Sequence, residues 1–254
     1  LINLDIFFLI ASSLMLIPDT VILYLKQKKL LFNFKKKLAT IKLLKILNSS
    51  RLYSLPLPSA LGTQFISFIQ LSKYISDKWE YFFLSLFERI NFVLVILLIS
   101  LSSILIFENE INLSIAIFKQ QDLIFGVLLL IIIFLIIFPA FFMPIFQIFK
   151  FKPKKIKIIR FGVRNLNLSF TFLSIFWYFF YFFRIYFVLL SLNIYLSLSV
   201  ILLIIGTNLL IQSIPVSAGG LGLRELTFSQ FFVLLNHPFE KGIIIGNLLF
   251  FQLF

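Results

Sequence analysis

The sequence predicts an all-α protein, a polytopic bundle of transmembrane helices that includes two broken or re-entrant helix elements. Three observations predict this class. The 254 residues are 61% hydrophobic with a mean hydropathy of +1.07, whereas soluble domains are roughly 45–50% apolar. The apolar residues form runs that are too long and too continuous for the alternating strands of a barrel. Breaks rich in Pro and Gly interrupt this pattern at two places.

Five apolar runs are candidates for helices that cross the bilayer, which takes about 20 residues. The first run is interrupted by Pro18 and Asp19, and the run at 243–254 is too short to cross alone. The expected spans are 6–25, 81–107, 123–149, 166–192 and 194–214.

Shorter helices are expected between the spans, over 30–47, 64–75 and 223–235. Their apolar residues are fewer and mixed with polar ones, so they are not expected to cross the bilayer. The chain is interpreted as one transmembrane domain over 1–254. It begins at Leu1 rather than Met and stops within an apolar run, which is typical of a piece of a longer protein.

The basic residues show how the chain is expected to lie in the membrane. Lys and Arg outnumber Asp and Glu by 23 to 10, an excess that in a soluble protein would indicate nucleic acid. Here the cations gather in 26–51 and 150–164, and the acidic segment 108–122 lies between them. Cytoplasmic loops are enriched in Lys and Arg. We therefore expect two cytoplasmic basic loops on a multi-pass inner (plasma) membrane protein, in contact with anionic lipid heads rather than nucleic acid.

Several kinds of chemistry are not expected from these residues. The chain has no cysteine and a single histidine, His237, so thiolate chemistry is excluded and a histidine-based metal site is not expected. No nucleophile–base set and no cluster of metal ligands stands out. We expect no catalytic residue, no metal and no cofactor, and the pattern resembles a transporter more than an enzyme.

The two breaks are the main pointers to a site. "LPSALG" runs over 57–62 and "SIPVSAGGLGLRE" over 213–225. Paired interruptions in two halves of a membrane protein indicate a transport site, because irregular backbone survives at membrane depth only where protein buries it or where it lines a wet cavity. A helix that starts after such a break directs N–H groups at an anion. The alternative is that both breaks are ordinary turns in which glycine permits a positive φ.

Charged residues within apolar segments are functional candidates. Arg184 lies well inside the fourth span and could bind a lipid phosphate, or could snorkel outward or rest on aromatic rings. Glu88 could meet Arg184 or Arg224 across the bundle, or could be an interfacial charge with its neighbour Arg89. Arg224 could hold a phosphate, while Glu225 suits the positive end of the helix that begins there.

The late break, with Gly219-Gly220-Leu221-Gly222-Leu223-Arg224-Glu225 at its centre, resembles the signature of the flippase-like membrane family, also called the lysylphosphatidylglycerol synthase transmembrane region. Leu57-Pro58-Ser59-Ala60-Leu61-Gly62 and Glu88-Arg89 are similar to two further motifs of that family, in the same order. Two departures stand out. Ala218 replaces a usual proline, and Thr63-Gln64-Phe65 lacks the charges that often follow the early break.

The resemblance implies a protein that moves an anionic phospholipid, or a polyprenyl-phosphate-linked intermediate, between leaflets. It also leaves two alternatives: the membrane half of a lipid-modifying aminoacyl or glycosyl transferase, whose soluble domain is not among these residues, or a non-transporting partner of proteins that build the envelope. The residues expected to bind the substrate are Arg184, Arg224, Glu225, Gly219, Gly220, Gly222, Pro58, Gly62, Glu88 and Arg89.

Overall fold

The computed structural model describes residues 4–34, 38–54, 57, 59–75, 78–106, 168–213 and 220–252. These residues form helices and contain no strand. Three of the helical segments are long and apolar enough to cross a membrane. The predicted all-α class is therefore confirmed. The predicted span 123–149 and the basic segment 150–164 lie outside the described residues.

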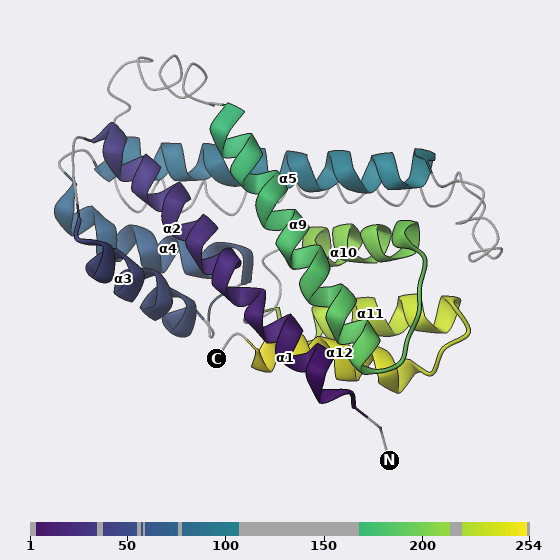
Figure 1. Cartoon of the computed structure of the whole chain (residues 1–254). Helices are drawn as coiled ribbons and strands as arrows, with labels where there is room; N and C mark the ends of the chain where they lie inside the picture. Colours follow the sequence, from purple (N-terminus) through teal and green to yellow (C-terminus); the bar gives the residue numbers. More distant parts are fainter. Residues whose placement is uncertain are drawn as a thin grey trace.

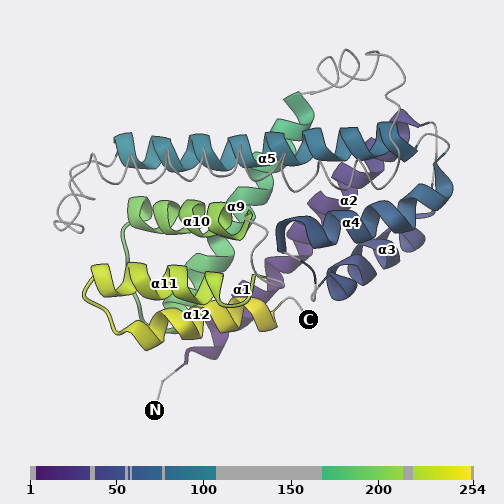
Figure 2. The same cartoon turned by 180° about the vertical axis from the view of Figure 1, so that it is seen from behind.

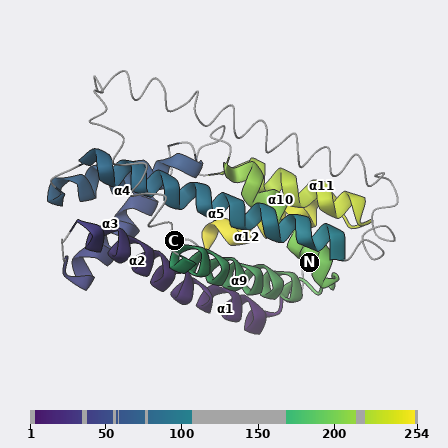
Figure 3. The ribbon, with the colours of Figure 1, turned by 90° about the horizontal axis from the view of Figure 1, so that it is seen from above.

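The helices pack as a bundle around α9 (Figures 1 and 2). α1 and α2 run end to end beside α9, and Figure 3 shows α9 between that pair and α5. α10 packs along α5, and α11 and α12 form a hairpin next to α10. The elements are α1 (Ile6–Leu14), α2 (Leu16–Asn33), α3 (Thr40–Tyr53), α4 (Ser59–Leu71), the 3₁₀ turn η1 (Ser72–Tyr74), α5 (Lys78–Ile106), α9 (Leu168–Ser191), α10 (Leu198–Ser213), α11 (Leu223–Leu234) and α12 (Phe239–Phe251).

Two hydrophobic clusters hold this arrangement. The larger one joins α5, α9, α10, α11 and α12. Its innermost members include Val188, Ile205 and Phe232, each 0% exposed. The smaller one joins α2, α3, α4 and the start of α5, with Leu71 at 0% and Tyr81 at 1% exposure. Within a bilayer, burial of such side chains stabilises the bundle through van der Waals packing rather than through removal from water. The clusters position α9 so that its inward face is enclosed.

The first span is longer than predicted, because the apolar helical segment runs over Ile6–Phe32 instead of ending at residue 25. Met15 separates α1 from α2, and its N–H bonds to the Ser12 and Ser13 carbonyls. The interruption predicted at Pro18 thus lies three residues earlier. Proline lacks an N–H and its ring clashes with the carbonyl four residues back, so the helix is disturbed on the N-terminal side of Pro18.

Two other predicted spans, 81–107 and 166–192, are confirmed as α5 and α9 to within a few residues. The predicted span 194–214 is shorter than expected. Its helix, α10, begins only at Leu198, because the chain turns at Asn193 with φ +56° and runs without helix to that point. Its 16 residues extend about 24 Å, less than the roughly 30 Å of a hydrocarbon core.

The segment 26–51, predicted as a basic loop, is mostly helical. α2 continues to Asn33 and α3 begins at Thr40, so the single helix predicted over 30–47 is wrong. Lys26, which was counted with the loop, lies inside α2 and is only 3% exposed.

The early break differs from the prediction at Gly62, which lies within α4 rather than before it. Ser59 starts the helix, so the expected helix over 64–75 begins five residues earlier and ends in η1. A Cβ on Gly62 would lie 2.8 Å from the Leu57 Cβ and 3.0 Å from the Ser54 carbonyl oxygen. The glycine therefore allows α4 to pack onto the turn that precedes it.

The apolar run at 243–254 belongs to α12, which pairs with α11 (Figure 2). α11 matches the helix predicted over 223–235 to within one residue. The two helices pack closely because glycines of α12 face α11. A Cβ on Gly242 would lie 2.3 Å from the Ser229 backbone, and one on Gly246 would lie 2.8 Å from the Glu225 Cγ. The run therefore forms a helical hairpin with α11.

Replacement of Gly242 by alanine is expected to destabilise this hairpin. The added methyl group meets backbone atoms of Ser229, which move only if the whole helix moves, and overpacking of this kind costs about 1–3 kcal/mol. Thermal unfolding in detergent would show a lower midpoint for Gly242→Ala. Glu240→Ala, at an exposed position of the same helix, is the control, and an equal midpoint for both variants would contradict the close packing.

Candidate functional site

Side chains with polar groups lie buried or partly buried along one face of α9. Ser174, Trp177, Tyr181 and Arg184 are spaced three, four and three residues apart, so they line one side of the helix. Ser174 is 0% and Arg184 is 4% exposed. The two ends of this row are separated by about 15 Å along the helix axis. An ionic cluster surrounds each end.

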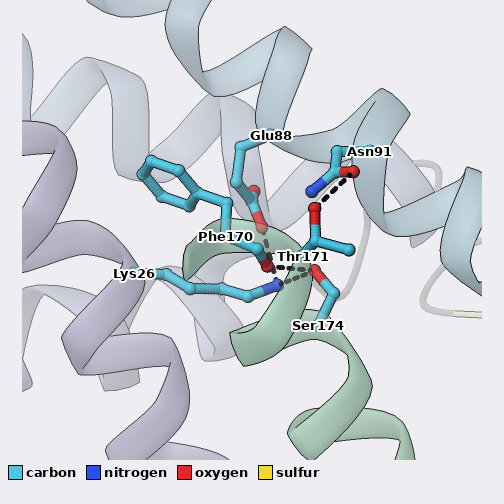
Figure 4. Close-up of polar contacts among 6 residues, drawn as sticks. All are labelled: Lys26, Glu88, Asn91, Phe170, Thr171 and Ser174. Carbon is cyan, nitrogen blue, oxygen red and sulfur yellow. Dashed lines mark hydrogen bonds and ion pairs between the residues drawn. The ribbon is translucent and has the colours of Figure 1, made fainter. Parts of the chain in front are cut away.

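The first cluster, the Lys26 cluster, comprises Lys26, Glu88, Asn91, Phe170, Thr171 and Ser174 (Figure 4). α2, α5 and α9 each contribute to it. The Lys26 Nζ lies 2.8 Å from the Glu88 Oε1 and donates a hydrogen bond of 3.0 Å to the Ser174 Oγ. The Ser174 hydroxyl donates in turn to the Phe170 carbonyl at 2.9 Å, and the Thr171 hydroxyl donates to the Asn91 Oδ1 at 3.3 Å. The buried ammonium is thus paired and ties three helices together.

The second cluster, the Arg184 cluster, comprises Asp19, Arg51, Tyr181, Arg184 and Arg224, from α2, α3, α9 and α11. Arg184 interacts electrostatically with each of the other four side chains. The Arg51 Nη2 donates to the Asp19 Oδ2 at 2.8 Å. Gln212 of α10 hydrogen-bonds Tyr181, which also interacts with both Arg184 and Arg224. Among the described residues, this cluster pairs Arg51 with Asp19 and places the Arg184 charge within electrostatic range of Asp19, Arg51 and Arg224.

Arg184 also holds the last turn of α12. Its Nη2 donates to the Leu249 carbonyl at 2.6 Å and its Nε donates to the Gln252 Oε1 at 3.1 Å. The Ser12 hydroxyl of α1 donates to the Arg184 carbonyl at 3.0 Å. A cation is favourable at this end of a helix because the last carbonyls lack intrahelical partners. Arg184 therefore points into the bundle rather than out to lipid, and it joins α1, α9 and α12.

The start of α11 carries the late break. Gly220 and Gly222 have φ values of +79° and +82°, which glycine adopts without strain. The Gly222 N–H donates to the Glu225 Oε2 at 2.7 Å. The carboxylate of this helix thus occupies its own N-terminus, where the sequence predicted an external anion. The positive charge next to it comes from Arg224, which is 3% exposed and lies over the Phe250 ring at 5.4 Å.

Aromatic rings connect the two clusters. Trp177 stacks on Tyr181 with ring centroids 5.0 Å apart and meets Phe92 edge-on at 4.9 Å. The Lys26 ammonium lies 5.0 Å and the Arg89 guanidinium 5.1 Å from the centroid of that Phe92 ring. A cation near a ring face is stabilised by roughly 0.5–2 kcal/mol. A row of cations and rings thus runs from the Lys26 cluster to the Arg184 cluster.

The structure brings together some of the residues predicted for the site. Arg184 and Arg224 share the Arg184 cluster, and Glu225 follows Arg224 at the start of α11. Glu88 does not reach either arginine; it pairs with Lys26, which the position of α2 against α5 places next to it. Arg89 contacts Phe92. The glycines of the predicted site that the structure describes serve turns and packing contacts; they are Gly62, Gly220 and Gly222. Two further predicted residues, Pro58 and Gly219, lie outside the described residues.

Sequence reasoning missed three charged residues of these clusters, namely Asp19, Lys26 and Arg51, as members of a site. Asp19 and Lys26 are seven residues apart, which places them on one face of a single helix. This spacing could have indicated that Asp19 and Lys26 belong to one buried polar face, if the first helix had been extended beyond residue 25. Arg51 gave no such signal, because its pairing with Asp19 joins two helices. Within the described residues, no group of three His, Asp or Glu side chains could hold a metal ion.

Buried ion clusters inside long apolar helices define a class: a multi-pass helical membrane protein with an ionic interior. The family model described as the lysylphosphatidylglycerol synthase TM region matches residues 1–252. The chain belongs to this family, and it is a membrane protein of a lipid-related family. No curated protein and no solved structure matches it.

Proposed function

We propose that this protein binds the phosphate of an anionic phospholipid, or of a polyprenyl-phosphate-linked intermediate, at the Arg184 cluster and moves the lipid between leaflets. The observation that carries the proposal is the burial of two guanidinium groups, those of Arg184 and Arg224, next to the ion pair of Arg51 with Asp19. Several guanidinium groups close together in the interior of a bundle favour an anion beside them, and a phosphate would bind them through charge-assisted, bidentate hydrogen bonds.

In the proposed mechanism the head group enters the bundle while the acyl chains stay in the bilayer. Arg51 and Arg224 contact the phosphate, and Arg184 contributes charge from its place at the end of α12. The aromatic rings between the clusters shield the path from the hydrocarbon, and the Lys26 cluster keeps α2, α5 and α9 together at its other end. The protein acts in the inner membrane, with 33–45 and 150–164 on the cytoplasmic side, in keeping with the distribution of cations. Lys26 and Arg51, at the two ends of the basic segment 26–51, lie instead among the helices.

The test is a leaflet assay with labelled phosphatidylglycerol in vesicles that contain the protein. Wild type is expected to speed transfer of the label between leaflets relative to empty vesicles. Loss of one charge-assisted contact, about 1.5–3 kcal/mol, is expected to slow Arg224→Gln by about tenfold or more. Lys45→Gln removes the same charge from an exposed position of α3 and is expected to behave as wild type. Equal rates for wild type and empty vesicles would contradict translocation.

A second candidate function is the membrane half of a lipid-modifying transferase, which the word synthase in the family description favours. It requires a soluble transfer domain, so the reading frame of the full-length gene discriminates between the two. In that case the Arg184 cluster would still bind the lipid phosphate, but wild type would bind labelled lipid without moving it. A partner of envelope-building proteins would instead tolerate Arg224→Gln in both binding and transfer.

A further inference from the structure

Asp19 is a buried carboxylate within the first membrane-spanning segment. It is 8% exposed and lies in the first turn of α2. Its Oδ2 accepts a hydrogen bond of 2.8 Å from the Arg51 Nη2 of α3. The Arg51 Nη1 donates a second bond of 3.3 Å to the Thr20 hydroxyl. The guanidinium of Arg51 is therefore held against α2 by one carboxylate oxygen and one hydroxyl.

This pairing engages only one of the two oxygens of the Asp19 carboxylate. The Asp19 Oδ1 is buried and has no hydrogen-bond partner among the described residues, although a buried acceptor without a partner costs about 1–3 kcal/mol. Arg184 lies close enough to interact with the Asp19 charge but donates its own hydrogen bonds to Leu249 and Gln252. One carboxylate therefore faces two guanidinium groups and bonds only one of them.

A phosphate would match these guanidinium groups better than Asp19 does. It carries more acceptor oxygens than a carboxylate, and it can bond two arginines at once. Asp19 occupies Arg51 on the side where such an anion would bind, and its negative charge repels a second anion across the same low-dielectric interior. Glu225 shows the same arrangement at the start of α11, where a carboxylate of the chain occupies N–H groups that suit an anion.

We propose that Asp19 is an internal counter-ion that competes with a phosphate group for Arg51 and so sets the affinity of the Arg184 cluster. This inference rests on the proposed function and identifies the residue that limits head-group binding. Asp19 holds Arg51 while the site is empty and releases it when a phosphate arrives. Because Asp19 is on α2 and Arg51 is on α3, exchange of partners also changes the link between these two helices.

Asp19→Asn keeps the size of the side chain and removes the competing charge. It is expected to bind phosphatidylglycerol on the order of tenfold more tightly than wild type, because the phosphate no longer meets a like charge or a competitor for Arg51 in the low-dielectric interior. Without the anion, the variant holds two buried cations, Arg184 and Arg224, with Arg51 beside them and no carboxylate to balance it, so it is expected to unfold at a lower temperature than wild type. Phosphatidylglycerol should therefore raise its unfolding midpoint by more than it raises that of wild type.

The experiment uses the whole chain in nanodiscs of phosphatidylcholine, with or without phosphatidylglycerol in equal parts. Binding of phosphatidylglycerol and the unfolding midpoint are measured for wild type, Asp19→Asn and Glu240→Gln, which makes the matched change at an exposed carboxylate. Inorganic phosphate is added to phosphatidylcholine discs in a parallel arm. A response to phosphate alone identifies a soluble anion as a ligand, and a response only to phosphatidylglycerol identifies the lipid head group.

The double variant Asp19→Asn/Arg51→Gln removes one charge of each sign, so its lipid affinity is expected to return toward wild type. A gain of affinity that came from a loosened fold would persist in the double variant, and this result would overturn the inference. Equal or weaker binding by Asp19→Asn would also overturn it. The proposed function has a separate test. It fails if wild-type protein does not speed transfer of labelled lipid between leaflets, and this outcome does not depend on the affinity of Asp19→Asn.

Discussion

Glu88→Gln is expected to be among the most destabilising single changes in this protein. It leaves the Lys26 ammonium, 3% exposed inside α2, without the carboxylate that lies 2.8 Å away. Loss of one partner of a buried ion pair costs about 3–5 kcal/mol, because the remaining charge is uncompensated. Thermal unfolding in detergent should show a large fall of the midpoint, and packing of α2 against α5 and α9 should loosen first.

The matched control is the double variant Lys26→Met/Glu88→Gln. Replacement of both charges leaves no buried ion, so the midpoint should recover most of the way to wild type. Glu240→Gln, which neutralises an exposed carboxylate, should leave the midpoint unchanged. A small effect of Glu88→Gln, or a double variant that is worse than the single one, would contradict the role of the Lys26 cluster in joining three helices.

Arg184→Gln is expected to release the end of α12 from the bundle. The change removes the bonds of 2.6 Å to the Leu249 carbonyl and 3.1 Å to the Gln252 side chain. Bonds from a charged donor are worth about 1.5–3 kcal/mol each, and a buried carbonyl left without a donor adds its own cost. We expect a loss of about 3 kcal/mol, which acts locally on α12 because its contacts with α9 are fewer than those with α11.

Cysteine labelling can measure this release, because the chain contains no cysteine of its own. Ile245→Cys places a thiol at a position of α12 that is 0% exposed. A maleimide reagent should react slowly with this variant and at least about tenfold faster when Arg184→Gln is added, as expected when local opening becomes easier by more than about 1.4 kcal/mol. Equal labelling rates in the two backgrounds would show that Arg184 does not hold α12.

Much of the fold could be predicted because the bilayer imposes long apolar runs on the sequence. α5 and α9 follow such runs closely, and the start of α11 follows from its glycines and Glu225. The boundary at Met15 and the late start of α10 were missed. Each depends on the residue at which a helix ends or begins next to a local disturbance. That disturbance is Pro18 in the first case and the turn at Asn193 in the second.

The site was predictable only in part. Arg184 and Arg224 were named as candidates from the sequence, which left open whether Arg184 faces the bundle or snorkels outward; both are at most 4% exposed. Which charges pair with one another could not be inferred, because the pairs join helices that are distant in sequence. The sequence left Glu88 either to meet an arginine or to be an interfacial charge, whereas the packing of α2 against α5 gives it Lys26. Arg51 looked like a loop cation until α3 placed it beside Asp19.

The central claim is that the Arg184 cluster binds an anionic head group, and lipid retention tests it most directly. Purified wild type, Arg224→Gln and Lys45→Gln are compared by native mass spectrometry in mixed phosphatidylglycerol and phosphatidylcholine, with unfolding midpoints to confirm that each is folded. We predict that wild type and Lys45→Gln retain phosphatidylglycerol selectively and that folded Arg224→Gln does not. Retention of both lipids without selectivity by all three proteins would contradict a head-group site and would leave the buried arginines as structural ties between helices.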